Sequence, residues 1–277
     1  MKRLIAVDSS ANLSCTENTD FVSVPLKIVT DEKEYVDDQA LDVPEMLREL
    51  KLYKGRSGTS CPSVSDWLTA FGDADEVFGL SLTSCLSGCW NAAQIAVQDF
   101  LAGRSGRKAF VLDTLSTGPE LELLTEKLRE LIGSGNPFES IREEIVRYAK
   151  CTHLMFSLKS LSNFAKNGRV SPVLAKAAGI LGICIVGRAS PEGQLEPQHN
   201  ARGEKNAIQK LLSGVLEAGY NGGKVRIRHT ENPDAAERFA KGLRSSFPSA
   251  DIRIGRNRGL CSYYAEEGGL LVGFESL

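Results

Sequence analysis

Short apolar runs alternate with longer amphipathic segments along most of this chain. The apolar runs predict strands at residues 4–7, 76–82, 108–112, 152–156, 183–188, 225–228 and 251–254, with weaker candidates at 21–26 and 35–36. The amphipathic segments predict helices at residues 88–101, 119–132, 138–148, 158–166, 172–181, 204–218 and 234–245. Two further helices are expected near Pro44 and after Ser63, each behind a capping side chain. Such alternation is typical of an α/β fold, in which helices cover both faces of a largely parallel sheet.

The α/β units begin again near residue 157. We therefore predict two α/β domains with largely parallel sheets, one over residues 1–157 and one over residues 158–277. In the second domain, the turn at residues 190–193 (Ser-Pro-Glu-Gly) predicts a hairpin that returns through residues 194–200.

Composition favours a packed protein and argues against several classes of function. With 277 residues, of which 42% are hydrophobic and 25% charged, the chain can bury a sizeable core. A net charge of -2 argues against a non-specific nucleic-acid binder, which needs a concentrated basic face. The N-terminal apolar run is too short for a signal peptide, and residues 177–186 are half of the ~20 residues that span a bilayer. We therefore expect a soluble, cytoplasmic protein.

Neither a disulfide framework nor a metal site is expected. The cysteines number seven, an odd count, in a chain without an export signal. Cys85 and Cys89 have no second cysteine pair to complete a zinc site, and His153, His199 and His229 lie far apart in sequence. Phosphate-loop, nucleophile-elbow and dinucleotide-binding motifs are missing as well, so no cofactor is indicated.

Hydroxyl-rich turns follow several of the predicted strands, at the edge where open α/β sheets bind ligands. They are residues 8–10 (Asp-Ser-Ser), 58–63 (Gly-Thr-Ser-Cys-Pro-Ser) and 83–88, which ends in Ser87-Gly88 at a helix start. The free N–H groups of a helix N-terminus suit a carboxylate or phosphate, and Arg169 adds a fork of donors. Each feature also has an ordinary explanation as a cap, a turn or a solvated arginine.

Together these turns resemble, in order and spacing, the DegV family of bacterial fatty-acid-binding proteins. Residues 59–63 are similar to the family motif TSqPS, and residues 84–93 to SSxLSGTyqsA. Residues 7–13 resemble its opening TDSssdL pattern, and residues 158–171 its segment ending in Gly-Arg-Ile-Ser. With further matches at Arg202 and at the strand ending in histidine, the resemblance covers essentially the whole chain.

The resemblance implies a long-chain fatty acid between the two domains. Its carboxylate would be held by Thr59, Ser60, Ser87 and Gly88. The acyl chain would lie under the C-terminal domain. Some family members resemble the lipid-carrying subunit of fatty acid kinase, which presents the acid to a separate kinase, and this implies Arg169 and Arg202 as contacts to the ligand or the partner.

Two departures from the family pattern concern the presumed head-group site. Cys89 replaces a threonine of the family, and it is a further possible contact to the ligand or partner. Residues 265–269 (Ala-Glu-Glu-Gly-Gly) replace a HtGPG turn, so the late histidine of the family is missing. Tyr263 and Tyr264 are the nearest side chains that could donate a hydrogen bond instead, and aromatic packing explains them as well.

The alternative is a small-molecule enzyme that uses the same turns for phosphotransfer or acyl hydrolysis, because the domains of the family resemble those of dihydroxyacetone kinase. Ser87 as a nucleophile would need a general base, and the sequence places none of the three histidines beside it. We therefore expect a non-catalytic lipid carrier.

Overall fold

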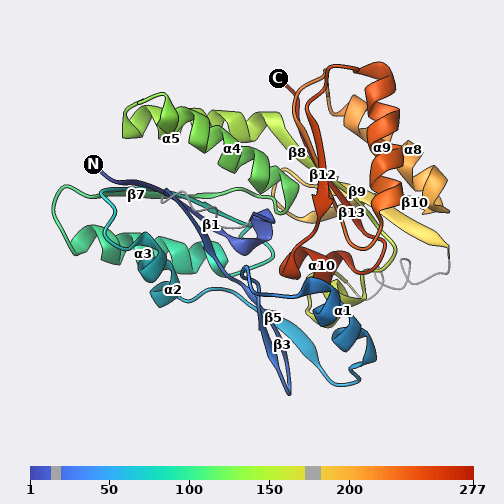
Figure 1. Cartoon of the computed structure of the whole chain (residues 1–277), viewed down its shortest axis with the longest axis horizontal. Coiled ribbons are helices and arrows are strands. Elements are labelled where there is room, and N and C mark those ends of the chain that lie inside the picture. The colour runs from blue at the N-terminus through green and yellow to red at the C-terminus, as the bar shows by residue number, and fades with distance from the viewer. Residues whose placement is uncertain (14–19, 172–181) are drawn as a thin grey trace.

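The computed structural model describes residues 1–13, 20–171 and 182–277, in which strands alternate with helices as predicted (Figure 1). The α/β fold class is confirmed. The helix expected at residues 172–181 lies outside the described residues. Within the described part of the chain, no helix combines the length and the apolar character needed to cross a membrane.

The first sheet has the parallel architecture that the sequence predicts. Its strand order is β2-β1-β6-β7. The strands are β1 (Arg3–Asp8), β2 (Phe21–Val24), β6 (Glu76–Ser81) and β7 (Lys108–Asp113). The covering helices are α2 (Val64–Phe71), α3 (Cys89–Ala102), α4 (Pro119–Gly133) and α5 (Phe138–Tyr148). Leu4 and Ala6 of β1 pack under α2 and α3, whereas Ile5 and Val7 pack under α4 and α5, so a core lies on each face.

The second sheet is mixed, which differs from the largely parallel sheet that we expected. Its order is β10-β9-β8-β13-β11-β12, and among these strands only β11 and β12 pair in parallel. The strands are β8 (Thr152–Leu158), β9 (Ile183–Ala189), β10 (Leu195–Arg202), β11 (Val225–His229), β12 (Ile252–Arg256) and β13 (Leu270–Glu275). Strand β13 was not predicted from the sequence, and it inserts antiparallel between β8 and β11. The hairpin of β9 and β10 is confirmed.

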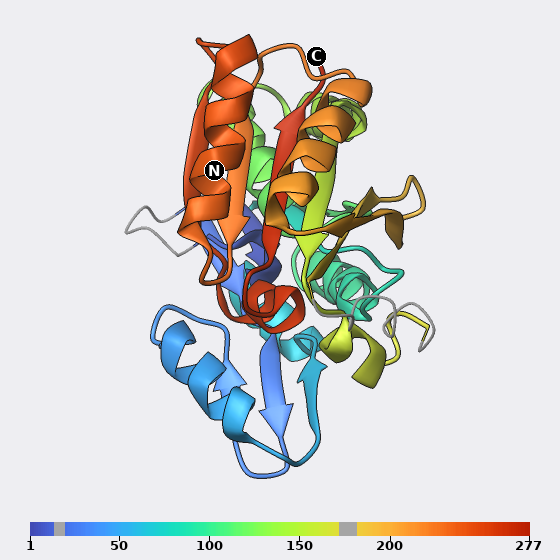
Figure 2. The same ribbon diagram turned by 90° about the vertical axis from the view of Figure 1, so that its right-hand side faces the viewer.

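Helices cover the second sheet on the side away from the first sheet. They are α8 (Glu204–Glu217) and α9 (Pro233–Ser246), which lie nearest the viewer in Figure 2. The short helices α6 (Ser162–Lys166) and α10 (Gly259–Ala265) pack at the lower end of the opposite face. The helix expected from residue 158 therefore begins later, because β8 continues through Leu158 and the next turn of helix starts at Ser162.

A third, small sheet extends below the other two (Figures 1 and 2). It pairs β3 (Lys27–Thr30) with β4 (Glu34–Val36) and β5 (Ser57–Ser60), and α1 (Val43–Leu52) covers it. We expected the start of residues 58–63 to be a loop. Pairing with β3 makes part of it a strand, although its side chains give no apolar signal.

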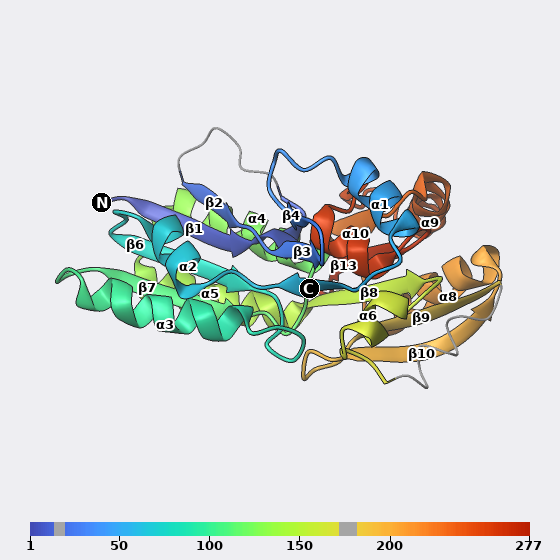
Figure 3. The same cartoon turned by 90° about the horizontal axis from the view of Figure 1, so that it is seen from below.

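Helix α4 joins the two large sheets, which lie side by side in Figures 1 and 3. Arg226 of β11 is fully buried and donates to both carboxylate oxygens of Glu126 at 2.8 and 2.6 Å. Arg228 binds Glu122 in the same way, at 2.8 and 2.6 Å. Since β8 pairs within the second sheet, the chain crosses from one half to the other just before β8. The domain boundary near residue 157 stays a prediction.

Candidate functional site

A cavity of about 310 Å³ lies between the turns of the first sheet and the face of the second. Its lining comes from β5, from the turn between β6 and α3, from β8 and from α10. This volume is at the lower end of the ~300–1,000 Å³ of small-molecule sites. Five of the residues expected at the site line it, namely Thr59, Ser60, Ser87, Gly88 and Arg169.

Hydrogen bonds bring these polar residues together from three parts of the chain. The hydroxyl groups of Thr59 on β5 and Tyr264 on α10 are 2.7 Å apart. Arg169 donates from Nε to the carbonyl of Leu86 at 3.3 Å and from a terminal nitrogen to the carbonyl of Asn167. The guanidinium group therefore lies against the same turn that carries Ser87.

The N-terminus of α3 opens onto this polar end of the cavity. Gly88 is the N-cap and has no side chain of its own to cap the helix, and the first turn carries no acidic residue. Ser87 Oγ accepts a hydrogen bond from the Cys89 amide at 3.2 Å. A β-carbon at Gly88 would lie 3.8 Å from the Cys61 sulfur, so Cys61 borders the same space. The positive end of the helix dipole therefore faces a region without an acidic partner.

Asp8, from the first hydroxyl-rich turn, stabilises the turn between β6 and α3 from the protein interior. It is fully buried, and it accepts hydrogen bonds from the amides of Leu82 at 2.6 Å and Ser10 at 3.0 Å. The Cys89 sulfur lies 3.6 Å from its carboxylate, outside the lining of the cavity. Burial raises the pKa of Asp8, and burial together with the Asp8 charge raises the pKa of the Cys89 thiol. Asp8 thus anchors the turn and does not face the cavity.

The opposite wall is apolar and consists largely of one face of the second sheet. Leu154, Phe156 and Leu158 alternate along β8 toward the cavity, and Leu271 of β13 lies beside them. Gly187 pairs with Phe156 across the strands, and a β-carbon there would clash with the Phe156 ring. The Phe156 ring can occupy this position because Gly187 has no side chain.

The β9–β10 hairpin closes the cavity against the turn before α3. Thr83 donates from its hydroxyl to the Gly193 carbonyl at 2.9 Å, and the Cys85 thiol donates to the Glu192 carbonyl at 2.8 Å. Gly193 has φ of +80°, and a β-carbon there would clash with Thr83, so both backbone conformation and space require glycine.

Helix α10 contributes Tyr264 to the lining of the cavity. Its ring packs 4.6 Å from that of Phe164, and burial raises the pKa of its phenol, so it remains a hydroxyl donor. Buried Asp37 holds the start of α10 by accepting from the amides of Gly259 at 2.8 Å and Leu260 at 3.0 Å. The sequence left open whether Tyr264 packs as an aromatic residue or makes a polar contact. In the structure its ring packs against Phe164 and its hydroxyl group contacts Thr59.

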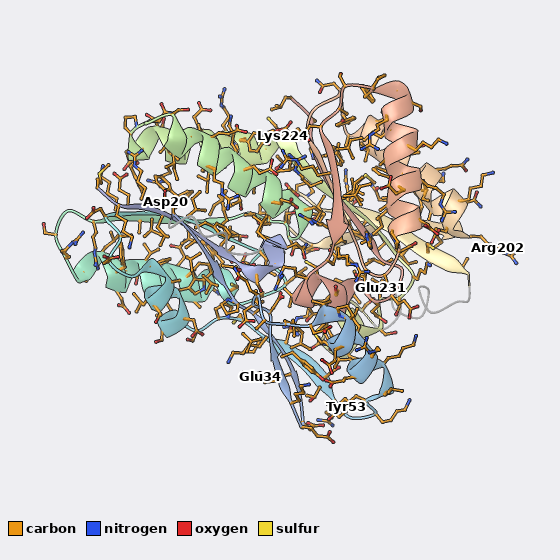
Figure 4. All side chains as sticks on the ribbon, in the orientation of Figure 1. Asp20, Glu34, Tyr53, Arg202, Lys224 and Glu231 are labelled. Carbon is orange, nitrogen blue, oxygen red and sulfur yellow. The ribbon has the colours of Figure 1, made fainter. Side chains whose placement is uncertain are left out.

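Several other candidates lie outside the lining. Arg202 is exposed on the edge strand β10, at the right of Figure 4. Glu266 accepts hydrogen bonds from the Ser160 hydroxyl at 2.9 Å and the Asn163 amide at 3.1 Å, away from the cavity. Among the described residues, no histidine, aspartate or glutamate lines the cavity, and its charged side chains are Arg169 and Arg188.

Two further hydroxyl-bearing residues of the lining were not predicted from the sequence. Ser116 and Thr117 come from the turn after β7, and the Ser116 carbonyl accepts a hydrogen bond at 2.8 Å from the amide of Thr83, which belongs to the predicted turn 83–88. The rule that ligands meet the carboxyl ends of parallel strands could have found Ser116 and Thr117, because they follow a predicted strand.

Comparison with known proteins gave matches over nearly the whole chain. A family model described as "Uncharacterised protein, DegV family" matches residues 2–276. A DegV domain-containing protein of Streptococcus pneumoniae is 41% identical over 258 residues, which are 93% of this chain and 92% of the relative. A solved DegV family protein from Eubacterium eligens, loaded with heptadecanoic acid, is 41% identical with a TM-score of 0.96, over 99% of this chain and 100% of that one. The Streptococcus pneumoniae Fatty Acid Kinase (Fak) B3 protein, loaded with linoleic acid, is 39% identical with a TM-score of 0.97 over 100% of both chains.

Proposed function

The chain belongs to the DegV family, as its turns predicted, and we propose on that premise that it binds a long-chain fatty acid in the cavity between the two sheets. The carboxylate lies at Thr59, Ser87 and Arg169, and the acyl chain lies against β8. The fatty acids in the two solved relatives support this ligand class.

One observation carries the proposal, which is the division of the cavity lining into two kinds of surface. Hydroxyl groups, Arg169 and a helix N-terminus gather at one end, and aliphatic and aromatic side chains form the opposite wall. A fatty acid has the same two parts. The lack of acidic side chains in the described lining favours an anionic head group, and the lack of a histidine base favours a carrier over the alternative enzyme.

The acyl chain supplies most of the affinity in this proposal. Burying ~14 methylenes at ~0.8 kcal/mol each contributes roughly 11 kcal/mol before ordering costs. The helix dipole contributes only ~0.3 to 1 kcal/mol to the carboxylate. The apolar wall therefore retains the lipid, and the polar end fixes its orientation.

We further propose that the protein presents its fatty acid to a separate fatty acid kinase. The name of the Streptococcus pneumoniae relative supports this partner. Arg169, in the wall of the cavity, is suited to the carboxylate or its phosphorylated product, whereas Arg202, exposed on β10, is suited to the partner.

Native mass spectrometry of the purified protein tests the ligand. We expect a co-purified acyl chain, and after delipidation we expect a fatty acid to bind more tightly than the primary alcohol of equal length. The alcohol is the matched control, because it keeps the tail and removes the charge. Equal binding of acid and alcohol would contradict the assignment of the polar end, and binding of neither would contradict the proposed function.

A coupled assay with a fatty acid kinase tests presentation. We expect Arg202→Ala to reduce acyl-phosphate formation while lipid binding stays unchanged, and Arg169→Ala to reduce both. Lys166→Ala, at an exposed position close to Arg169, is the matched control for loss of a positive charge. If Arg202→Ala forms acyl phosphate at the normal rate, Arg202 has no part in the partner contact.

A further inference from the structure

A second cavity, of about 490 Å³, adjoins the first. The two cavities share three lining residues, Leu154, Arg188 and Ala189. They meet where β8 and β9 part, since Met155 and Arg188 are the last residues that pair between these strands. Beyond the shared residues, the second cavity has a partly polar lining that includes Glu120 and Thr152.

The shared residues lie far from the polar end of the first cavity. Leu154, Phe156 and Leu158 face the first cavity from alternate positions of β8, so Leu154 is about 13 Å from Leu158 along the strand. The chain after Leu158 leads to α6 and Arg169, at the polar end. A carboxylate bound there directs its acyl tail toward Leu154 and Ala189.

We propose that Leu154 and Ala189 form the end wall of the acyl site and set the longest chain that the protein accepts. This inference rests on the proposed function. Leu154 is only 5% exposed, and it lines both cavities. The guanidinium group of Arg188 donates hydrogen bonds to Glu196 at 3.1 and 3.2 Å. The apolar part of the end wall therefore consists of Leu154 and Ala189.

Substitutions at the two wall residues are expected to change the preferred acyl-chain length in opposite directions. Leu154→Ala removes the partition, so longer acyl tails can extend into the second cavity. Ala189→Leu adds volume to the wall and excludes tails that now fit. Each methylene buried or excluded changes the affinity about fourfold, so a shift of two methylenes changes the ratio of long to short acids up to about fifteenfold.

The experiment measures dissociation constants of the delipidated protein for saturated fatty acids of about 12 to about 22 carbons. We expect the preferred length to rise in Leu154→Ala and to fall in Ala189→Leu. The matched control is Leu161→Ala, because Leu161 is fully buried in the same apolar cluster but lines neither cavity. This control should lose stability and keep the wild-type preference.

An unchanged preference in folded Leu154→Ala would overturn the inference, as would an equal shift in Leu161→Ala. If Leu154→Ala does not fold, Ala189→Leu decides alone, and an unshortened preference overturns the inference. Failure of the proposed function is distinct, since the wild-type protein would then bind no acid of any length.

Discussion

The two walls of the cavity are built in different ways. The wall from the N-terminal half consists of strand ends and turns, which bring the hydroxyl groups of Thr59, Thr83 and Ser87 to the surface of the cavity. The wall from the C-terminal half is the face of a sheet, and it brings side chains such as Leu154 and Phe156. Turns favour glycine and short polar residues such as serine and threonine, so they present polar groups. A sheet face presents the side chains that its alternation places on that side.

Because of this difference, we expect substitutions in the polar wall to affect ligand binding and substitutions in the apolar wall to affect stability as well. Thr59 and Ser87 are only half-buried, so their hydroxyl groups can be removed without opening a core. Phe156, in contrast, belongs to the cluster that holds β8, α6 and α10 together, so any change there alters the fold as well as the site. We expect substitutions in the two walls to divide accordingly.

The largest expected effect is on the apolar wall. Phe156→Ala removes a ring that is 2% exposed, and truncation of a buried phenylalanine costs ~3 to 5 kcal/mol of unfolding free energy. Chemical denaturation measures this loss. Leu216→Ala, at a side chain that is 46% exposed, is the control and should change stability by no more than ~0.5 kcal/mol. A loss below ~1 kcal/mol for Phe156→Ala would show that this wall is not part of the core.

The next effect concerns Glu120, a carboxyl group held between the two halves. It is 4% exposed, and it accepts hydrogen bonds from the hydroxyl groups of Ser116 and of Thr152, the latter at 2.8 Å. Burial raises its pKa from 4.5 to about 7. The folded state therefore keeps the proton between these pH values while the unfolded state loses it, and stability falls as pH rises through this window.

Glu120→Gln removes this dependence on pH. The stability of the variant relative to the wild type should rise by roughly 3 kcal/mol from about pH 4 to about pH 8, as measured by denaturation at both pH values. Glu143→Gln, at an exposed position on α5, is the matched control and should give a constant difference. A constant difference for Glu120→Gln would mean that folding does not shift the pKa of this carboxyl group.

The polar wall was largely predictable from the sequence, and the reason is local chemistry. Ser87-Gly88 follows a predicted strand and precedes a helix, in agreement with the rule that ligands meet strand ends, and Thr59 belongs to a recognisable motif. The parallel first sheet was predictable because its apolar strands alternate with amphipathic helices. In each case, residues close in sequence determine the feature.

The apolar wall was not predictable, because long-range pairing determines it. Alternation along β8 predicts a strand, but only its pairing with β13 and β9 decides which face meets the cavity. The tetrapeptide of β5 becomes a strand only because β3 lies beside it. Tyr264 reads as an ordinary aromatic residue until the fold brings it against Thr59, a residue distant in sequence.

A smaller effect is expected at the polar wall. Ser87→Ala removes a hydroxyl group that lines the cavity, and the loss of one hydrogen bond to a charged acceptor costs ~1.5 to 3 kcal/mol of binding free energy. Titration with a fluorescent fatty acid measures it, and denaturation should show little change in stability. The control is Ser105→Ala, at an exposed position outside the lining. If Ser87→Ala binds with unchanged affinity, Ser87 is not part of the head-group site.

The smallest effect is expected for Tyr264→Phe, which keeps the ring and removes the hydroxyl group beside Thr59. The loss of one neutral hydrogen bond lowers the affinity for a fatty acid by ~0.5 to 1.5 kcal/mol. If the phenol donates to the carboxylate in place of the missing histidine, the affinity for the primary alcohol should fall less than that for the acid. The same titration with acid and alcohol therefore measures how far Tyr264 distinguishes the charged head group.

Tyr263→Phe is the matched control for this last comparison. Tyr263 is 1% exposed, and its hydroxyl group lies 2.9 Å from the Ser57 hydroxyl and accepts from Asn167 at 3.0 Å, outside the lining. Its variant should lose stability and keep the wild-type ratio of acid to alcohol affinity. Equal ratios in both variants would mean that Tyr264 only packs against Phe164, and Arg169 would then be the contact that the C-terminal half makes to the carboxylate.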